Sequence, residues 1–338
     1  MKLKNNMILS WKPYILHLKT PFRIAHGTSN TRQNMILQLD EGLGEAAAVP
    51  YYNETISGIS DYLSNLDVSD WHPDHLEDIL CMLPAGSQAA HTGIDLALHD
   101  LWGKRLNQPL YRLLGLNPDK IPETSYTIGI DQPELMADRA RQMQWPIYKI
   151  KLGSEDDEAI VAAIREATSA RIRLDANTAW DRQRAADIIP RLAEYKIEFI
   201  EQPLPKGDIE GLRWLRSKNF GVPIFVDENI QTARDVVAHA GAVDGIVIKL
   251  MKSGGIREAL HAIHVARALD MQVMIGCMVE SSLAVTAAAH LAPLCEYVDL
   301  DGPLLVQNDP FEGIKYQGGR IILPQEPGLG VVPIQGKH

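Results

Sequence analysis

The sequence of 338 residues predicts an α/β protein, in which an eight-stranded (β/α) barrel follows a smaller α+β module. Three observations lead to this prediction. The length corresponds to about two domains of roughly 150 residues each. After Ile121, short apolar runs alternate with amphipathic helical segments, as in parallel sheets whose strands are joined by helices. Eight such runs are present, the number that closes a barrel, and an open doubly wound sheet is the alternative.

The first 120 residues predict the α+β module. Two strand-like runs cover residues 8–19 and 35–39, and the second leads into a turn at Asp40-Glu41-Gly42. Helical segments follow at about 56–66 and 91–106. Strands followed by helices are typical of α+β folds.

The next part of the chain, residues 121–310, contains the strands of the predicted barrel. Between most of them lies one amphipathic helix, as at 155–168 and 256–269, where apolar residues recur on one face. The strand-like runs cover residues 125–130, 147–152, 171–175, 198–201, 223–227, 245–250, 272–276 and 297–300. Residues 311–338 form a separate C-terminal segment.

Composition excludes several classes of protein. The net charge of −10 is unfavourable for binding nucleic acid or an anionic membrane, because both require a positive surface. No apolar stretch is long enough to span a bilayer, and the N-terminus lacks the apolar core of a signal peptide. The three cysteines form neither a zinc motif nor a disulfide framework, so we expect a cytoplasmic protein.

Three carboxylates end consecutive predicted strands. Asp175, Glu201 and Asp227 lie 26 residues apart, which is about the length of one βα unit. We therefore expect them to converge at the C-terminal mouth of the barrel, where barrel enzymes place their chemistry. Converging carboxylates remain ionised only if a cation neutralises them, and an all-oxygen site suits Mg²⁺.

Lysines stand on both sides of these carboxylates. Lys149 and Lys151 point to the same side of the second predicted strand, and Lys249 ends the sixth. A lysine close to another cation has a lowered pKa and can act as a base. Two facing bases suggest a proton removed from one face of a carbon and returned to the other through an enediolate, although dehydration or cycloisomerisation would use the same groups.

A further carboxylate pair lies on the last predicted strand. Asp299 and Asp301 point to one side of it and would favour a cationic substrate group such as an ammonium. The alternative is an ordinary acidic turn before Gly302-Pro303.

Taken together, these residues resemble the enolase superfamily, muconate-lactonizing subgroup, and within it the dipeptide epimerases. The resemblance covers nearly the whole chain. Its most specific motifs are Lys149-Ile-Lys151, Leu174-Asp175-Ala-Asn177, Glu201-Gln-Pro203, Asp227-Glu228, Ile248-Lys249 with the following Gly254-Gly255, and Asp299-Leu-Asp301.

The resemblance implies an enolase-like barrel capped by residues 1–120, with the segment after residue 310 packed back against that capping domain. It also implies a homo-oligomer. The implied site residues are Asp175, Glu201 and Asp227 for Mg²⁺, Lys151 and Lys249 for acid/base catalysis, Lys149 for the substrate carboxylate, Asp299 and Asp301 for the substrate ammonium, and Thr127, Cys277 and Val279 for the pocket wall.

The implied function is Mg²⁺-dependent inversion of the α-carbon of a dipeptide's C-terminal residue, with L-Ala-D/L-Glu from murein peptides as the expected substrate. Alternatives within the superfamily are o-succinylbenzoate synthase, N-acylamino-acid racemase and muconate cycloisomerase. A catalytically inactive barrel is disfavoured because none of the lysines or carboxylates is missing.

Specificity is expected to come from the loops near 22–29 and 50–55. Epimerases of this kind carry an arginine in the first loop that pairs with the substrate glutamate, and the matching position here is His26 or Gly27. This difference leaves two interpretations open: an uncharged or bulkier second residue, or another cation that serves the glutamate.

Overall fold

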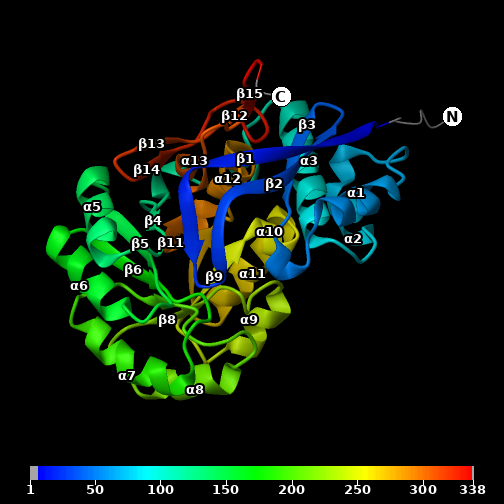
Figure 1. The fold of residues 1–338 in the computed structure, drawn as a ribbon. Helices are drawn as coiled ribbons and strands as arrows, with labels where there is room; N and C mark the ends of the chain where they lie inside the picture. The colour runs from blue at the N-terminus through cyan, green and yellow to red at the C-terminus, as the bar shows by residue number, and fades with distance from the viewer. Residues whose placement is uncertain (1–6, 337–338) are drawn as a thin grey trace.

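Residues 7–336 are described by a computed structural model, in which a parallel sheet curves almost into a closed barrel (Figure 1). The sheet has eight strands in the order β11-β10-β9-β8-β7-β6-β5-β4. A parallel bridge between Thr124 and Val298 joins its two edges and nearly closes the ring. The barrel, rather than the open sheet, is therefore confirmed. Its strands are β4 (Tyr126–Ile128), β5 (Ile147–Lys151), β6 (Arg171–Asp175), β7 (Ile200–Glu201), β8 (Ile224–Val226), β9 (Gly245–Lys249), β10 (Gln272–Gly276) and β11 (Tyr297–Asp299).

Helices surround the barrel, and the longer ones present an apolar face to the strands. In α6, for example, Ile160, Val161 and Ile164 are fully buried. The surrounding helices are α5 (Pro133–Met143), α6 (Asp157–Ala167), α7 (Arg182–Ala193), α8 (Ile209–Ser217), α9 (Ala233–His239), α10 (Leu250–Ser253), α11 (Ile256–Ala268), α12 (Ser282–Leu291) and α13 (Gly302–Leu305).

The N-terminal end of the barrel interior is filled by a separate apolar cluster. Phe199, Phe225, Val247 and Met274 are fully buried there and pack against Tyr297. The guanidinium of Arg173 lies 5.0 Å from the Tyr297 ring centre. Because apolar side chains fill the N-terminal end, the polar residues at the strand ends meet at the C-terminal mouth.

The described part of the capping module contains an antiparallel sheet and four α-helices. Its elements are β1 (Leu9–Ile24), β2 (Gly27–Leu39), β3 (Gly42–Ala47), α1 (Ile56–Ser64), α2 (Leu76–Met82), α3 (Gln88–Arg105) and α4 (Leu110–Leu113). Strand β3 was not predicted, because its glycines weaken a strand signal. The packing explains them: a Cβ on Gly44 would lie 2.0 Å from the carbonyl oxygen of Gly93 in α3.

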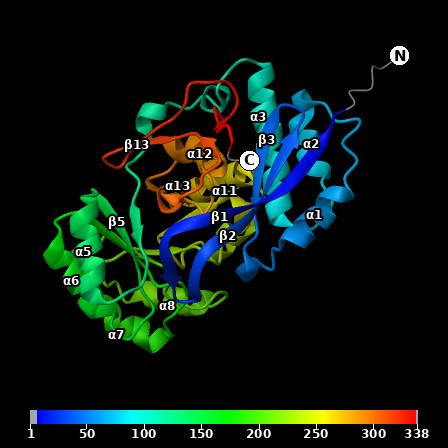
Figure 2. The same ribbon diagram turned by 45° about the horizontal axis from the view of Figure 1, so that its top comes forward.

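Strands β1 and β2 form a hairpin whose far end reaches past the rest of the capping module and crosses the barrel mouth (Figure 2). The sequence predicted β2 only over residues 35–39, whereas the strand begins at Gly27. Its first half is polar and mostly exposed, so the apolar alternation that marks a strand is missing there.

Two buried carboxylates of the capping module hold it against the barrel. Glu45 accepts hydrogen bonds from the Ser281 amide (3.0 Å) and the Ser281 hydroxyl (2.5 Å) at the start of α12. Asp95 accepts one from the Ile256 amide (2.7 Å) at the start of α11. Both carboxylates satisfy free amides at a positive helix end, which favours one docking geometry.

The C-terminal segment contains β12 (Phe311–Glu312), β13 (Lys315–Gln317), β14 (Arg320–Ile322) and β15 (Val332–Pro333). It contacts both parts of the molecule. The Leu329 amide donates to Asp100 of α3 at 2.8 Å, and the Thr124 amide beside the barrel donates to the Gly319 carbonyl at 2.9 Å. The boundaries at residues 120 and 310 stay predictions. Among residues 7–336, no helix is both long and apolar enough to cross a membrane.

A buried histidine links this segment to the barrel and predicts a pH-dependent stability. His290 of α12 accepts a hydrogen bond from the Tyr111 amide (3.2 Å), and its other ring nitrogen lies 3.1 Å from the Leu329 carbonyl oxygen. Burial lowers the pKa of His290 to about 4. The unfolded chain, with a pKa of about 6.5, binds more protons between these values, so stability is lost as pH falls from about 6.5 to 4.

We therefore expect His290 to cost up to about 3 kcal/mol of unfolding free energy over this range. The measurement is denaturant unfolding at pH 7 and pH 4 for the wild type and for His290→Gln. The variant should lose less stability on acidification, and an identical loss in both proteins would contradict the prediction.

Candidate active site

The register of the parallel strands brings the predicted site residues to one level. Lys151 pairs with Asp175, and Asp175 pairs with Glu201. On the other side of the ring Lys249 pairs with Gly276, which pairs with Asp299. Because neighbouring parallel strands end at the same edge, their terminal side chains meet at the barrel mouth.

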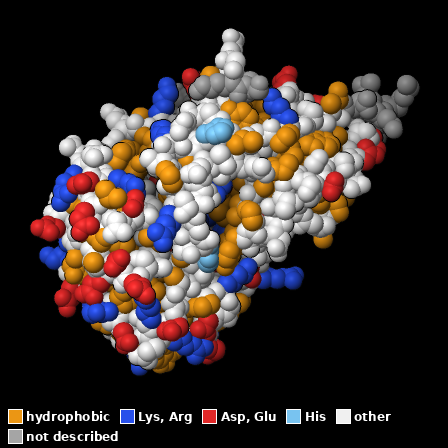
Figure 3. All heavy atoms as spheres, in the orientation of Figure 1, with side chains coloured by type: hydrophobic (Ala, Val, Ile, Leu, Met, Phe, Trp, Pro, Cys, Tyr) orange, Lys and Arg blue, Asp and Glu red, His pale blue; other side chains and the backbone are white. Residues whose placement is uncertain are grey.

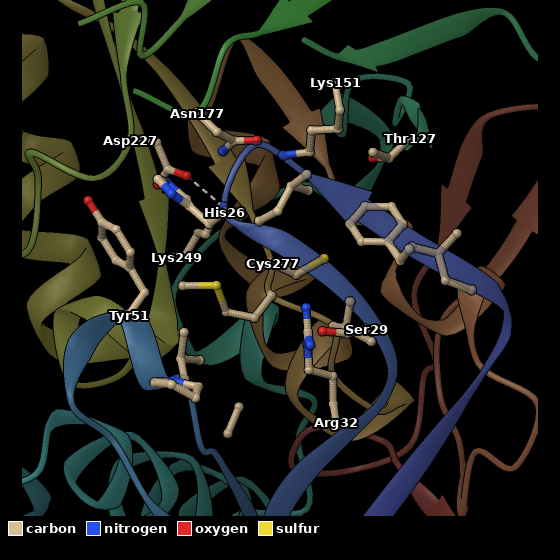
Figure 4. A pocket seen from close by; sticks show the side chains of 18 of the residues that line it. His26, Ser29, Arg32, Tyr51, Thr127, Lys151, Asn177, Asp227, Lys249 and Cys277 are labelled. Carbon is tan, nitrogen blue, oxygen red and sulfur yellow. Dashed lines mark hydrogen bonds and ion pairs between the residues drawn. The ribbon is translucent and has the colours of Figure 1, made fainter. Parts of the chain in front are cut away.

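A cavity of about 310 Å³ lies between this mouth and the capping module. Figure 3 shows the molecule hollowed beside the β1–β2 hairpin, and Figure 4 shows side chains from both modules around the cavity. The loops expected to shape it contribute Phe22, Ile24, residues 26–29 and residues 50–52. The predicted site residues in its wall are Thr127, Lys149, Lys151, Asp227, Lys249, Cys277, Val279, Asp299 and Asp301. Asp175 and Glu201 lie beneath the wall with no exposed surface.

Lys149 is the centre of a buried ion network. Its ammonium lies 3.1 Å from Asp175, 2.8 Å from Glu201 and 2.9 Å from Asp299. Burial alone would lower the pKa of Lys149, but Asp299, Glu201 and Asp175 raise it well above its usual value. Burial and the nearby charge of Asp175 raise the pKa of Glu201. The network thus joins carboxylates of β6, β7 and β11 through one cation.

The two predicted catalytic lysines each pair with one carboxylate. Lys151 Nζ lies 2.6 Å from Asp175 Oδ2, and Lys249 Nζ lies 2.7 Å from Asp227 Oδ2. The sequence interpretation expected lowered lysine pKa values. Burial alone would lower the pKa of Lys249, but Asp227 raises it, so in this arrangement that lysine holds its proton. Its carboxylate partner decides the direction of the shift.

A second lysine contacts Asp227, and the sequence interpretation did not assign it. Lys252 Nζ donates to Asp227 Oδ1 and to the Val247 carbonyl at 3.0 Å, and its side chain is 1% exposed. Burial lowers the pKa of Lys252 despite the charge of Asp227. Lys252 does not line the cavity, so its contact holds the Asp227 carboxylate in place from below.

The carboxylate pair at the end of β11 has two different environments. Asp299 accepts hydrogen bonds from Ser125 Oγ (2.6 Å) and Lys149 Nζ (2.9 Å). Asp301 accepts one from the Thr127 amide at 2.6 Å and has no ion pair among the described residues. Burial raises the pKa of Asp301, and the charge of Asp299 raises it further, to about 7. A cation placed beside Asp301 would reverse this shift.

Cys277 and Val279 follow β10 and belong to the apolar part of the wall. Cys277 Sγ lies 3.5 Å from the Asp299 carbonyl oxygen. Val279 packs with Leu16 of β1 and with Val306. The hairpin therefore rests directly on the barrel beside the cavity.

The donor set at the mouth has the oxygen chemistry that Mg²⁺ prefers. In the part of the chain that the structure describes, no three His, Cys, Asp or Glu side chains already surround a common point, because lysine ammoniums lie between the carboxylates. Acceptors nevertheless remain without a donor. Asn177 Oδ1 and Glu228 Oε2 are buried and receive no hydrogen bond. A hard cation fits this excess of buried oxygen atoms.

Several residues of the cavity wall carried no sequence assignment as site residues. Asn177 and Glu228 belong to the motifs around Asp175 and Asp227, but polar residues after a strand are also typical of ordinary loops. Arg32 lies in the half of β2 that was not predicted as a strand. Tyr51 comes from the 50–55 loop, and its ring lies 5.0 Å from that of His26.

Comparison with known proteins places the chain in a family. Residues 13–115 match the family model of the mandelate racemase/muconate lactonizing enzyme N-terminal domain, and residues 133–336 match the enolase C-terminal domain-like model. The chain is 39% identical to an L-Ala-D/L-Glu epimerase from Bacteroides thetaiotaomicron, covering 97% of this chain and 88% of that protein.

Solved structures agree with this relationship. The L-Ala-D/L-Glu epimerase of Bacillus subtilis, in a complex with substrate, superposes with a TM-score of 0.91 at 31% identity, covering 96% of this chain and 98% of that one. The dipeptide epimerase of Enterococcus faecalis, with Mg and L-Leu-L-Tyr, gives 0.91 at 34% identity, covering 98% and 99%. These relatives are epimerases, which confirms the predicted isomerase class. The chain belongs to the mandelate racemase/muconate lactonizing enzyme family of the enolase superfamily.

Proposed function

We propose that this protein is a Mg²⁺-dependent dipeptide epimerase that inverts the α-carbon of the C-terminal residue. The observation that carries the proposal is the position of two lysines on opposite strands of one cavity. Lys151 ends β5 and Lys249 ends β9, the second and sixth strands of the eight-stranded ring, and both line the cavity. A substrate α-carbon between them has one ammonium or amine on each face.

In this mechanism one lysine removes the α-proton and the other returns a proton to the opposite face, through an enediolate intermediate. Each lysine serves as base for one epimer and as acid for the other. Lys149 is positioned to neutralise the substrate carboxylate, whose charge rises as the α-proton leaves. The carboxylates beside Lys151 and Lys249 hold both ammonium groups at the cavity wall.

Asp175, Glu201 and Asp227 are the residues that would hold Mg²⁺. The chemistry supplied by the bound ion is stabilisation of negative charge on the substrate carboxylate. A cation near these carboxylates would also compete for the partners of Lys151 and Lys249 and thereby lower the pKa of lysines that act as bases.

Asp299 and Asp301 would bind the substrate's α-ammonium. The free carboxylate of Asp301 supports this assignment, since an ammonium would supply the cation that it lacks. Two relatives are named as L-Ala-D/L-Glu epimerases, and we adopt that dipeptide as the proposed substrate. Its origin in murein peptides stays a prediction. A cytoplasmic location and a homo-oligomer remain predictions of the same proposal.

The direct test is incubation with L-Ala-L-Glu and a small panel of dipeptides in D₂O with Mg²⁺. Proton NMR should show loss of the C-terminal Cα proton and appearance of the second diastereomer. Failure of every dipeptide to exchange that proton would refute the proposal.

Separate removal of the two lysines should separate the two half-reactions. Lys151→Gln and Lys249→Gln should each slow epimerisation by about 10³-fold, and each should retain deuterium exchange for only one epimer. Lys252→Gln is the matched control, since it removes a lysine from the same Asp227 but not from the cavity wall. It should slow both epimers equally, and equal slowing in all three variants would contradict the two-base assignment.

Asp301→Asn should distinguish a dipeptide epimerase from the alternative N-acylamino-acid racemase. Loss of a charged hydrogen bond to the ammonium should reduce kcat/KM for dipeptides by about 10- to 100-fold. N-succinyl amino acids have no α-ammonium, so any turnover of these compounds should not fall. Unchanged dipeptide turnover would instead favour the alternative.

Removal of divalent cations with EDTA should abolish exchange, and Mg²⁺ should restore it. Mg²⁺ should also raise the Tm of the metal-free wild type, because it relieves repulsion among buried carboxylates. Asp227→Asn should reduce this Tm shift. Full activity in EDTA would refute the metal assignment.

A further inference from the structure

Arg32 contributes a positive charge to the cavity from the capping module. It lies on β2, lines the cavity and is half-buried. In Figure 4 its side chain extends from the hairpin toward Cys277, beside Ser29. Among residues 7–336, it is the only lysine or arginine of the capping module in the cavity wall, since the others there are Lys149, Lys151 and Lys249 of the barrel.

The guanidinium of Arg32 has no partner within the described part of the chain. No hydrogen bond or ion pair joins it to a carboxylate. Burial lowers the pKa of Arg32. Other buried arginines are paired: Arg173 Nε lies 2.7 Å from Glu198. A half-buried cation without a partner is costly, and such groups are normally compensated by an opposite charge.

The strand geometry explains why this side chain faces the cavity. Residues 32 and 34 of β2 point to the same side, and Asn34 also lines the cavity, where Glu45 accepts its amide hydrogen at 2.6 Å. Arg32 pairs across the hairpin with Leu16, which packs on Val279 of the barrel. The packing of Leu16 on the barrel therefore fixes the part of the hairpin that carries Arg32.

The first loop itself does not provide this charge. His26 lies at the tip of the hairpin, where its ring contacts Tyr51 at 5.0 Å and its Nε2 lies 3.4 Å from Thr178 Oγ1. His26 and Tyr51 both line the cavity. The relatives include epimerases with acidic and with hydrophobic substrates, so family membership alone leaves the charge of the substrate side chain open.

Resting on the proposed function, we propose that Arg32 forms the subsite for a carboxylate side chain of the dipeptide. The planar guanidinium can bind a carboxylate through two parallel hydrogen bonds. Of the four barrel carboxylates that line the cavity, Asp227 and Asp299 are paired with lysines, and among the described residues neither Glu228 nor Asp301 forms an ion pair with Arg32, so the guanidinium is available to the substrate. The acidic specificity thus comes from the second strand of the hairpin.

The test compares kcat and KM for L-Ala-L-Glu, its uncharged isostere L-Ala-L-Gln, and L-Glu-L-Ala. The wild type should prefer an acidic substrate. Arg32→Met should reduce kcat/KM for that substrate by about 10- to 100-fold, mainly through KM, and leave L-Ala-L-Gln unchanged. Arg32→Lys should restore part of the loss, because it keeps the charge without the planar fork.

Arg23→Met is the matched control, since Arg23 lies on the same hairpin and is exposed outside the cavity wall. It should behave as the wild type. An Arg32-dependent preference for L-Glu-L-Ala would also support the subsite and would assign the carboxylate to the first residue.

The two proposals fail in different ways. If no dipeptide exchanges its Cα proton, the proposed function fails, and the subsite with it. If dipeptides exchange but neither L-Ala-L-Glu nor L-Glu-L-Ala is preferred over L-Ala-L-Gln, or if Arg32→Met slows all three to the same extent, only the subsite is overturned. Calorimetric titration of L-Ala-L-Glu into the wild type and Arg32→Met should show the same difference in affinity.

Discussion

Burial of several carboxylates at one end of the barrel is the constraint on which the rest of the site depends. Asp175 and Glu201 have no exposed surface, and Asp227 is 2% exposed. Such groups repel one another and remain ionised only beside cations. In this structure lysines of β5, β9 and α10 supply the positive charge. The same attraction that stabilises the carboxylates keeps those lysines at the cavity wall.

The capping module completes the cavity because its attachment is polar and directional. Glu45 and Asp95 bind the free amides at the starts of α12 and α11, so the module docks on the barrel in one orientation. The β1–β2 hairpin is thereby held across the mouth. The barrel thus contributes groups suited to proton transfer, and the module contributes residues that contact the remainder of a ligand.

Much of this arrangement could be predicted from the sequence because the strands of a barrel recur at a regular spacing along the chain. The spacing of Asp175, Glu201 and Asp227 marked three consecutive strand ends, and the structure brings their side chains to the same mouth. Strand β3 was not predicted because it contains glycines, which are needed where the strand packs closely against α3, and α3 is distant in the sequence. Lys252 was not assigned to the site because its burial against Asp227 depends on how α10 follows β9. Arg32 escaped because an exposed hairpin has no apolar alternation.

The sequence by itself determined the alternation of strands and helices and the chemical types of residue at the strand ends, because periodicity and spacing are local properties of the chain. Closure of the sheet into a barrel rather than an open sheet was decided by the tertiary structure. Only the tertiary structure decided which of these charges meet. Pairing of Lys149 with three carboxylates, the absence of a partner for Arg32 among residues 7–336 and the direction of the Lys249 pKa shift all depend on distances between parts of the chain that are far apart in sequence. Such distances follow from register and docking, since electrostatic interactions depend on separation in space and not in sequence.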